Sequence, residues 1–303
     1  GVKSIMFGHD SIKAQQNNIV VAGGLENMTN APYILSKARK GFRMGHADVK
    51  DHMFLDGLED AYEEGKLMGS FAEDTAEHYQ FTREQQDNFA ITSLERAKKA
   101  NEDGTFESEI VPIKVLNRKN EIIINKDEQP FKSDITKIPT LKPAFRKNGT
   151  VTAANSSSIS DGASSVILML ESEAQKRGIK PLARIIDHST NSQEPKWFTT
   201  APIGAIEKVL EKSGWKKTDV DLFEVNEAFA VVPMAVMKDI GISNDILNIY
   251  GGACALGHPV GASGTRIVTT LINALKKNNL KKGVASLCIG GGEATALTLE
   301  IIN

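Results

Sequence analysis

The stretch that decides the fold is Val284-Ala285-Ser286-Leu287-Cys288-Ile289-Gly290-Gly291-Gly292-Glu293, a short apolar run that ends in glycines. Its length and its bounding glycines indicate a buried β-strand. A helix is expected before it, because Gly261-Ala262-Ser263-Gly264 is followed by apolar residues at helical spacing, Ile267, Leu271 and Leu275. These segments predict a helix that leads into a buried strand.

The same order of elements occurs at the start of the chain. Residues 2–14 have a partial helical period, and residues 18–24 form a short apolar run, typical of a buried strand, that ends in Gly23-Gly24. Small details repeat too, since Gly-Val-Lys at 1–3 corresponds to Gly-Thr-Arg at 264–266. Because alternating helices and strands are typical of layered architectures, we interpret the chain as two related α/β halves.

The middle of the chain has a different character. Residues 30–150 are richer in charge, and Glu121-Ile122-Ile123-Ile124 is their one run typical of a buried strand. Thr82-Arg83-Glu84-Gln85 is a capping box, which predicts a helix that runs toward Asn101 and stops at Gly104. Insertions of this length between core elements are usually functional, so we predict an inserted subdomain.

The later part of the chain predicts a second set of core elements. A strand is expected from Pro181 to Ile186, and then a helix with Pro202 early and Gly214 after its end. The next strand, residues 220–225, leads into Asn226-Glu227-Ala228-Phe229. Open α/β sheets bind ligands at the carboxyl ends of their strands, so these polar side chains are candidates for a site.

Bulk properties exclude several classes of protein. A formal net charge of −2 over 303 residues argues against nucleic-acid binding. No apolar run approaches the roughly 18 residues that a membrane-spanning helix needs, so no membrane partner is expected. Two cysteines without metal-ligand spacing indicate neither a disulfide framework nor a zinc site. A reducing compartment fits best, the cytoplasm first, with the mitochondrion left open.

Two reactive side chains lie among glycines. A lone loop histidine usually bonds a backbone carbonyl, but His258 stands between Gly257 and Pro259, where a substrate can approach closely. A neutral imidazole can polarise a carbonyl and transfer protons near neutral pH. Cys288 alone would suggest a small buried hydrophobe, yet the glycines after it expose N–H groups to a developing oxyanion. We assign Cys254, which lacks such a setting, to packing.

Asn226 has two interpretations that the sequence leaves open. Its side chain could cap a helix, or its amide could hold a water molecule that donates a hydrogen bond to a substrate carbonyl. Glu227 could brace neighbouring loops or support the site indirectly.

The ordered set of these segments resembles the thiolase family. Asn-Glu-Ala-Phe at 226–229, Gly-His-Pro at 257–259 and Cys-Ile-Gly-Gly-Gly at 288–292 match in type and order, and the likeness covers nearly the whole chain, including residues 151–157 and 160–163. The resemblance implies an α/β thiolase fold of two similar five-layered αβαβα halves, the first incomplete, with a loop domain that holds coenzyme A. The expected divisions are 1–29 with 157–180, then 30–156, then 181–303.

The family's reaction is reversible and implies acyl-CoA and CoA as partners. Two acetyl-CoA condense to acetoacetyl-CoA and CoA, or a 3-ketoacyl-CoA is cleaved by CoA, without a metal or redox cofactor, in a homodimer or homotetramer. By motif, Cys288 would be the acid/base at the acetyl methyl group. His258 would help to activate the nucleophilic cysteine and, with a water held by Asn226, would bind the thioester oxygen, while Gly290 would lend its N–H to a second oxyanion hole.

The resemblance also implies residues that contact the substrate. Positions that line the acyl pocket or meet the CoA chain in similar enzymes are Met68, Phe145, Phe198, Phe229 and Ser157. Phe145 and Phe229 could equally be plain core residues. Lys132 would lie near the nucleotide of CoA, although the local spacing departs from the family there.

Thiolases carry the acyl group on a cysteine in a Cys-x-Ser-Gly run. Gly1-Val2-Lys3-Ser4 resembles the continuation of that run, so the nucleophile is expected three residues before Gly1. No remaining cysteine can replace it. We therefore expect negligible thiolase turnover from this polypeptide alone and activity in a longer parent. Robust CoA-dependent cleavage of acetoacetyl-CoA by the polypeptide would show this placement to be wrong.

The expected activity is that of an acetyl-CoA C-acetyltransferase acting on short acyl chains. One alternative is a 3-ketoacyl-CoA thiolase of fatty-acid β-oxidation. Leu67 favours this alternative slightly, because short-chain members of the family often have a polar residue at that position, beside Met68. Another is a catalytically silent protein that binds CoA or lipid. The intact His258, Asn226 and Cys288 argue against that second alternative.

Overall fold

The computed structural model describes residues 1–117 and 120–302. Its centre is a four-stranded sheet in the order β7-β10-β9-β8, in which β8 runs parallel to β9 and the other pairs are antiparallel. The strands are β7 (Ala183–Ser192), β8 (Leu222–Val225), β9 (Lys282–Ile289) and β10 (Glu293–Ile301). The predicted strands near 181–186, 220–225 and 284–289 are thus present.

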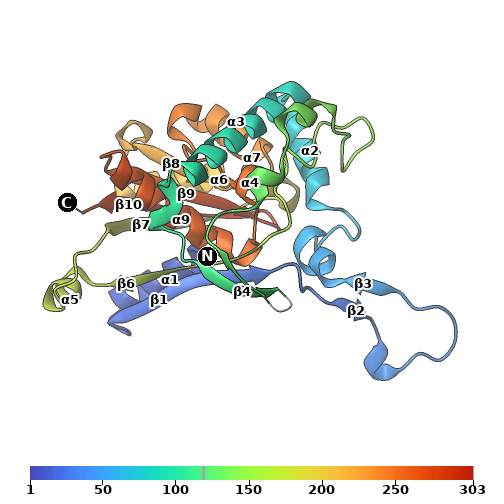
Figure 1. Ribbon diagram of the computed structural model, residues 1–303, viewed down its shortest axis with the longest axis horizontal. Helices are drawn as coiled ribbons and strands as arrows, with labels where there is room; N and C mark the ends of the chain where they lie inside the picture. The colour runs from blue at the N-terminus through green and yellow to red at the C-terminus, as the bar shows by residue number, and fades with distance from the viewer. Residues whose placement is uncertain (118–119, 303) are drawn as a thin grey trace.

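Two helices form the layer beneath this sheet, α1 (Val2–Lys13) and α9 (Val260–Lys277). In Figure 1, α9 lies between the four-stranded sheet and a second sheet made of β1 (Ile19–Asn27) and β6 (Asp161–Met169), and it packs against both. The two helices begin side by side, because a Cβ on Gly264 would lie 2.3 Å from the backbone nitrogen of Val2. The predicted repeat of helix and strand is confirmed by α1–β1 and α9–β9.

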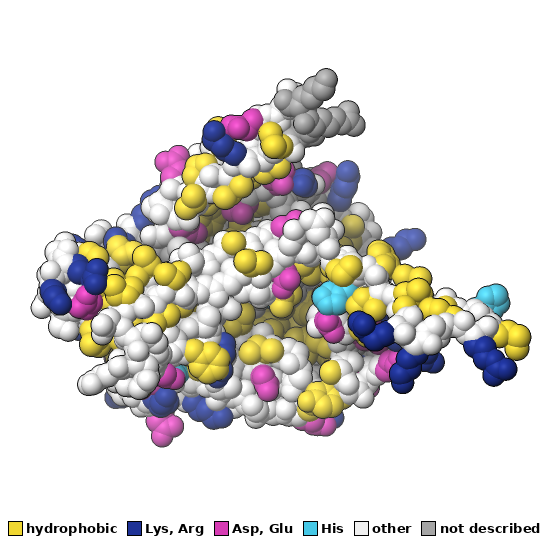
Figure 2. Space-filling model, turned by 90° about the horizontal axis from the view of Figure 1, so that it is seen from below, with side chains coloured by type: hydrophobic (Ala, Val, Ile, Leu, Met, Phe, Trp, Pro, Cys, Tyr) yellow, Lys and Arg dark blue, Asp and Glu magenta, His cyan; other side chains and the backbone are white. Residues whose placement is uncertain are grey.

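The strand predicted at residues 18–24 is longer and more exposed than expected. It runs to Asn27, pairs with β6 in antiparallel register, and leaves Val21 and Leu25 each 71% exposed. One face of the pair packs on α1 and α9, so burial alternates along the strands. Figure 2 shows hydrophobic side chains spread over the outer face. The prediction of a buried strand here is wrong because only one face is covered.

Helices cover the opposite face of the four-stranded sheet. Helix α6 (Ala201–Ser213) packs on β7, β9 and β10 and ends at Gly214, which takes the left-handed conformation with φ of 67°, as the predicted Pro-first and Gly-last pattern requires. The remaining helices of the later half are α7 (Val231–Val236) and α8 (Ala253–Leu256). Helix α5 (Glu171–Lys176) follows β6.

The middle segment contains α2 (Met68–Tyr79), α3 (Arg83–Glu102) and α4 (Gln129–Lys132). The capping box of α3 is present, with the Thr82 hydroxyl accepting from the Gln85 N–H and the Gln85 side chain accepting from the Thr82 N–H. Two hairpins complete the segment, β2 (Tyr33–Leu35) with β3 (Val49–Asp51), and β4 (Ile113–Asn117) with β5 (Asn120–Ile124). The first hairpin extends away from the body (Figure 1).

The run at 121–124 is a strand, but the prediction that it is buried is wrong. Its side chains are largely exposed, and Ile123 is 57% exposed, because β5 belongs to a two-stranded sheet with β4. In the part of the chain that the structure describes, no helix has the length and apolar character needed to cross a bilayer.

Two hydrophobic clusters hold the layers together. One fills the space between the sheet, α6, α7 and α2, and includes Phe71, Ile206 and Phe223. The other joins α1 and α9 to the sheet through Ile5, Leu271 and other buried residues. Full burial of one such side chain contributes about 1.5–3 kcal/mol to the stability of the fold. The two clusters therefore hold the strands, and the residues at their ends, in place.

Candidate active site

Asn226 and Cys288 lie at the carboxyl ends of neighbouring parallel strands. Val225 is opposite Ser286 in the β8–β9 ladder, and the Asn226 N–H donates to the Ser286 carbonyl at 3.0 Å. Cys288 follows two residues later on β9. The sheet therefore brings these two side chains, 62 positions apart in sequence (288 minus 226), to one edge.

His258 reaches the same edge from the turn between α8 and α9. Its Nε2 lies 3.2 Å from Asn226 Nδ2, its Nδ1 lies 2.6 Å from Ser263 Oγ, and its backbone N–H donates to the Ser158 carbonyl at 3.2 Å. Gly257 before it has φ of 93°, and a Cβ there would lie 2.0 Å from Ser160 Oγ. The histidine is thus held on three sides, and among residues 1–117 and 120–302 neither of its ring nitrogens bonds a backbone carbonyl.

Ser263 was not singled out from the sequence, although it orients the imidazole. Its hydroxyl lies within hydrogen-bond distance of both His258 Nδ1 and the Pro259 carbonyl, the latter at 3.0 Å. It sits in the first turn of α9, five residues after the histidine (263 minus 258). A hydroxyl one helical turn beyond a Gly-His-Pro segment is the signal that could have found it.

Asn226 does not cap a helix. Helix α7 starts at Val231 without a side-chain cap, and the Asn226 amide faces His258 instead. Its Oδ1 is buried and accepts no hydrogen bond from the residues that the structure describes. The amide therefore has an oxygen available to bind water or a substrate group, as the second interpretation of the sequence requires.

Burial sets the charge state of both reactive groups. Desolvation, helped by the positive charge of Arg266, lowers the pKa of His258 to about 4. Desolvation raises the pKa of the Cys288 thiol to about 12. Near neutral pH the site therefore contains a neutral imidazole and a protonated thiol, a combination that can hydrogen-bond a carbonyl oxygen and donate a proton to carbon.

Glu227 binds three elements to one another. Its buried carboxylate accepts from Ser93 Oγ on α3 at 2.7 Å, from Asn248 Nδ2 at 2.9 Å and from the Cys254 N–H on α8 at 3.1 Å. Gly252 packs so closely that a Cβ would lie 2.3 Å from the carboxyl carbon. Of the two roles left open by the sequence, the contacts support the brace between loops.

We expect Glu227→Gln to lower the free energy of unfolding by about 1–3 kcal/mol, because an amide NH₂ would face donors and leave a buried group unpaired. Turnover should fall more than KM rises, since the displaced turn is the one that carries His258. Urea unfolding and steady-state kinetics measure the two effects. Glu95→Gln, on the exposed face of α3, is the control. Equal unfolding free energies for both variants would contradict the brace.

The depressed pKa of His258 predicts a pH-dependent contribution to stability. The unfolded chain binds a proton below pH 6.5 and the folded chain only near pH 4, so this contribution is complete above 6.5 and is lost as pH falls toward 4. Buried Glu224, whose pKa is raised to about 8, has the opposite dependence. Urea unfolding of His258→Asn and wild type at several pH values isolates the histidine, and a stability difference that does not change with pH would contradict the assignment.

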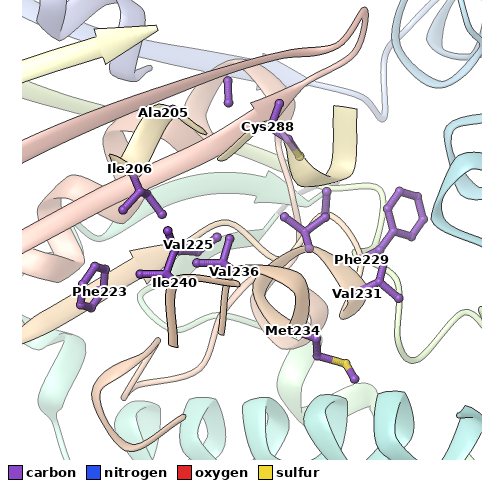
Figure 3. Packing of buried hydrophobic residues seen from close by; sticks show 14 of the residues in the cluster. Ala205, Ile206, Phe223, Val225, Phe229, Val231, Met234, Val236, Ile240 and Cys288 are labelled. Atoms are coloured by element: carbon purple, nitrogen blue, oxygen red, sulfur yellow. The ribbon is translucent and has the colours of Figure 1, made fainter. Parts of the chain in front are cut away.

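An apolar cluster surrounds the end of β9. Cys288, Phe198 and Phe229 are buried members of one cluster, and Met68 and Phe145 pack against it. The rings of Phe145 and Phe229 meet edge to face at 5.9 Å. Figure 3 shows Cys288 and Phe229 within this cluster. The four side chains predicted to line the acyl pocket therefore belong to, or pack against, the cluster that contains the thiol.

The other predicted contact residues differ in their placement. A Cβ on Gly290 would lie 3.5 Å from the sulfur of Met68, which places this glycine beside the apolar cluster. The Ser157 N–H donates to the Ala228 carbonyl at 2.9 Å, so Ser157 runs alongside the turn after Asn226. The exposed Lys132 side chain on α4 has Glu128 as an ion-pair partner at 3.9 Å, and α4 packs against α8. Its place near the CoA nucleotide stays a prediction.

Comparison with known proteins agrees with this geometry. Residues 1–172 match the family model of the thiolase N-terminal domain, and residues 179–301 match that of the thiolase C-terminal domain. A probable acetyl-CoA acetyltransferase of Dictyostelium discoideum is 50% identical over 301 residues, which are 99% of this chain and 72% of that protein.

Solved structures give the same result. The crystal structure of an acetyl-CoA acetyltransferase of Bacillus anthracis matches with a TM-score of 0.96 at 42% identity, over 100% of this chain and 76% of that one. A thiolase of Ascaris suum, crystallised in complex with coenzyme A, matches with a TM-score of 0.93 at 39% identity, over 99% of this chain and 76% of that one. The chain therefore has the thiolase fold and belongs to the thiolase family.

Proposed function

We propose that the protein is an acetyl-CoA C-acetyltransferase, which condenses two acetyl-CoA to acetoacetyl-CoA and CoA and catalyses the reverse cleavage. The observation that carries the proposal is the pair of Asn226 and His258, whose Nδ2 and Nε2 atoms lie 3.2 Å apart. This pair lies at the edge of the sheet where β9 presents Cys288. The names of the Dictyostelium and Bacillus relatives support the same activity.

His258 and Asn226 would stabilise the enolate-like thioester oxygen. For this role the imidazole would carry its proton on Nε2, so Ser263 Oγ–H would donate to Nδ1 in place of the Pro259 carbonyl, and Asn226 would turn its Nδ2 away from Nε2. A water bound by the Asn226 amide would donate a second hydrogen bond. Because the imidazole is neutral, it polarises the oxygen without giving up its proton.

Cys288 would move the proton at the reacting carbon. In cleavage, the bond between C2 and C3 breaks as the 3-acyl group passes to the thiolate of the nucleophilic cysteine, and the Cys288 thiol protonates C2 to give acetyl-CoA. The Cys288 thiolate then takes the proton of CoA–SH, whose sulfur attacks the acyl-enzyme. The raised pKa of Cys288 suits the first of these steps, because the group begins protonated.

A steady-state assay with acyl chains of increasing length tests the proposal in the full-length protein. We expect kcat/KM to be greatest for acetoacetyl-CoA and to fall with each added pair of carbons, because bulky Phe145, Phe198 and Phe229 belong to, or pack against, the cluster that contains the thiol. A maximum at a longer chain would favour a 3-ketoacyl-CoA thiolase. CoA binding without turnover in the full-length protein would favour a catalytically silent relative.

Coenzyme A and acyl-CoA are the proposed small-molecule partners, and the CoA complex of the Ascaris relative supports this choice. The proposed reaction uses no metal or redox cofactor.

We propose a homodimer or homotetramer. The exposed apolar side chains of the β4–β5 hairpin support this proposal, among them Ile113, Leu116 and Ile123. Light scattering of the purified protein measures this directly. The two free cysteines support the cytoplasm as a reducing location.

A further inference from the structure

A cluster of three side chains joins the two halves of the molecule at a place remote in sequence from the catalytic motifs. His9 and Asp10 lie on α1, and His188 lies on β7. Asp10 Oδ1 is 2.7 Å from His188 Nε2 and 3.1 Å from His9 Nδ1, and the two imidazole rings stand at 90° with their centres 5.1 Å apart. One carboxylate oxygen thus lies between two ring nitrogens.

The position of His188 follows from the alternation of β7. Asp187 pairs with Lys212, and Ser189 donates to the Ala205 carbonyl, so odd-numbered residues here face α6. The even-numbered residues face α1, and Lys3 Nζ donates to Thr190 Oγ1 at 3.1 Å. Helix α1 therefore runs along this face of the strand and presents Asp10 to His188 two turns after Lys3.

The three groups form a ligand set that zinc prefers. Two imidazole nitrogens and a carboxylate oxygen, with water in the fourth position, are a frequent zinc environment with bonds of about 2.0–2.2 Å. The three ligand atoms all lie within 4.8 Å of one another, so small side-chain rotations suffice to place them around one ion.

The burial of these three side chains also suits a metal site in which one coordination position is open to solvent. The side chains of His188 and His9 are 13% and 20% exposed, whereas Asp10 is 57% exposed. The histidines are thus held within the protein while the carboxylate side faces solvent. We propose that His9, Asp10 and His188 form a zinc-binding site that links α1 to β7. The site takes no part in the thiolase reaction and does not depend on the proposed function.

Metal titration of the full-length protein, after removal of bound metal with a chelator, tests the proposal. We expect one equivalent of Zn²⁺ to bind by calorimetry, Co²⁺ to give the visible absorption of a tetrahedral site, and the melting temperature to rise with Zn²⁺. His188→Ala and Asp10→Asn should weaken binding by at least about tenfold. Asp10→Asn preserves the shape of the side chain, so the test remains valid if His188→Ala fails to fold.

The matched control is His46→Ala, which removes an exposed histidine from another part of the chain. It should leave Zn²⁺ affinity and the Zn²⁺-dependent shift in melting temperature unchanged. The proposal is overturned if no saturable equivalent binds, if His188→Ala binds as tightly as wild type, or if binding is lost in Cys288→Ala instead. The first of these results would leave Asp10 as a hydrogen-bond acceptor for two histidines.

Discussion

Cys288→Ala is expected to lower the turnover of acetoacetyl-CoA cleavage by about 10²–10⁴-fold, the range typical of a lost general acid or base. The thiol lies at the end of β9 in a cluster that also contains Phe198 and Phe229, and Met68 and Phe145 pack against that cluster. Binding should change little, because alanine preserves the apolar surroundings. Steady-state kinetics of the full-length protein provide both kcat and KM.

Two further measurements make this test specific. Exchange of the acetyl-CoA methyl protons with deuterium should fall in parallel with turnover, since both require proton transfer at carbon. Cys254→Ala is the control, because that residue contributes a backbone N–H to Glu227 and packs at the cluster margin. A Cys288→Ala enzyme that keeps wild-type exchange would show that the thiol is not the acid/base.

The second large effect is expected for His258→Ala, which should lower kcat by about 10²–10³-fold, the usual cost of losing one donor to an oxyanion. KM should change less, because the oxygen gains most of its charge after binding. Asn226→Ala should produce a similar loss if a water held by its amide is the second donor. Steady-state kinetics again separate kcat from KM.

Ser263→Ala provides the graded comparison for this prediction. It leaves the imidazole in place but removes the partner of Nδ1 at 2.6 Å, so the loss should be smaller than for His258→Ala. A Ser263→Ala loss that equals the loss in His258→Ala would mean that orientation accounts for the whole effect. Unchanged kcat in His258→Ala would contradict the oxyanion role itself.

Sequence patterns predicted those parts of the fold that depend on local order. The helix from Arg83 to Glu102 follows from its capping box, and the end of α6 follows from Gly214. The repeated order of helix and strand likewise predicted the pairs α1–β1 and α9–β9. Each of these depends on residues within one or two helical turns, where spacing alone is informative.

Burial could not be predicted in the same way. The runs at 18–24 and 121–124 are apolar enough for a core, yet Val21 and Ile123 are exposed, because burial depends on what covers each face. An apolar run indicates only that a strand could be buried, and not that another element covers it. The division into 1–29 with 157–180, 30–156 and 181–303 also stays a prediction.

The same distinction between local and distant residues applies to the candidate site. Glycine-flanked His258 and Cys288 could be selected from the sequence, whereas the partners of Glu227 could not, because Ser93 and Asn248 come from distant segments. Lys132 was placed near the CoA nucleotide on weak local spacing, and that placement stays a prediction. Contacts between residues that are far apart in the sequence can be identified only from the structure.

The close start of α1 and α9 has an electrostatic consequence. Gly1 and Gly264 pack backbone to backbone, so the first turns of both helices lie together, and α9 begins two residues after His258. Each helix carries a macrodipole equivalent to roughly half a positive charge at that end. Two such ends create a standing field that favours negative charge near the imidazole, and this field is present before any substrate arrives.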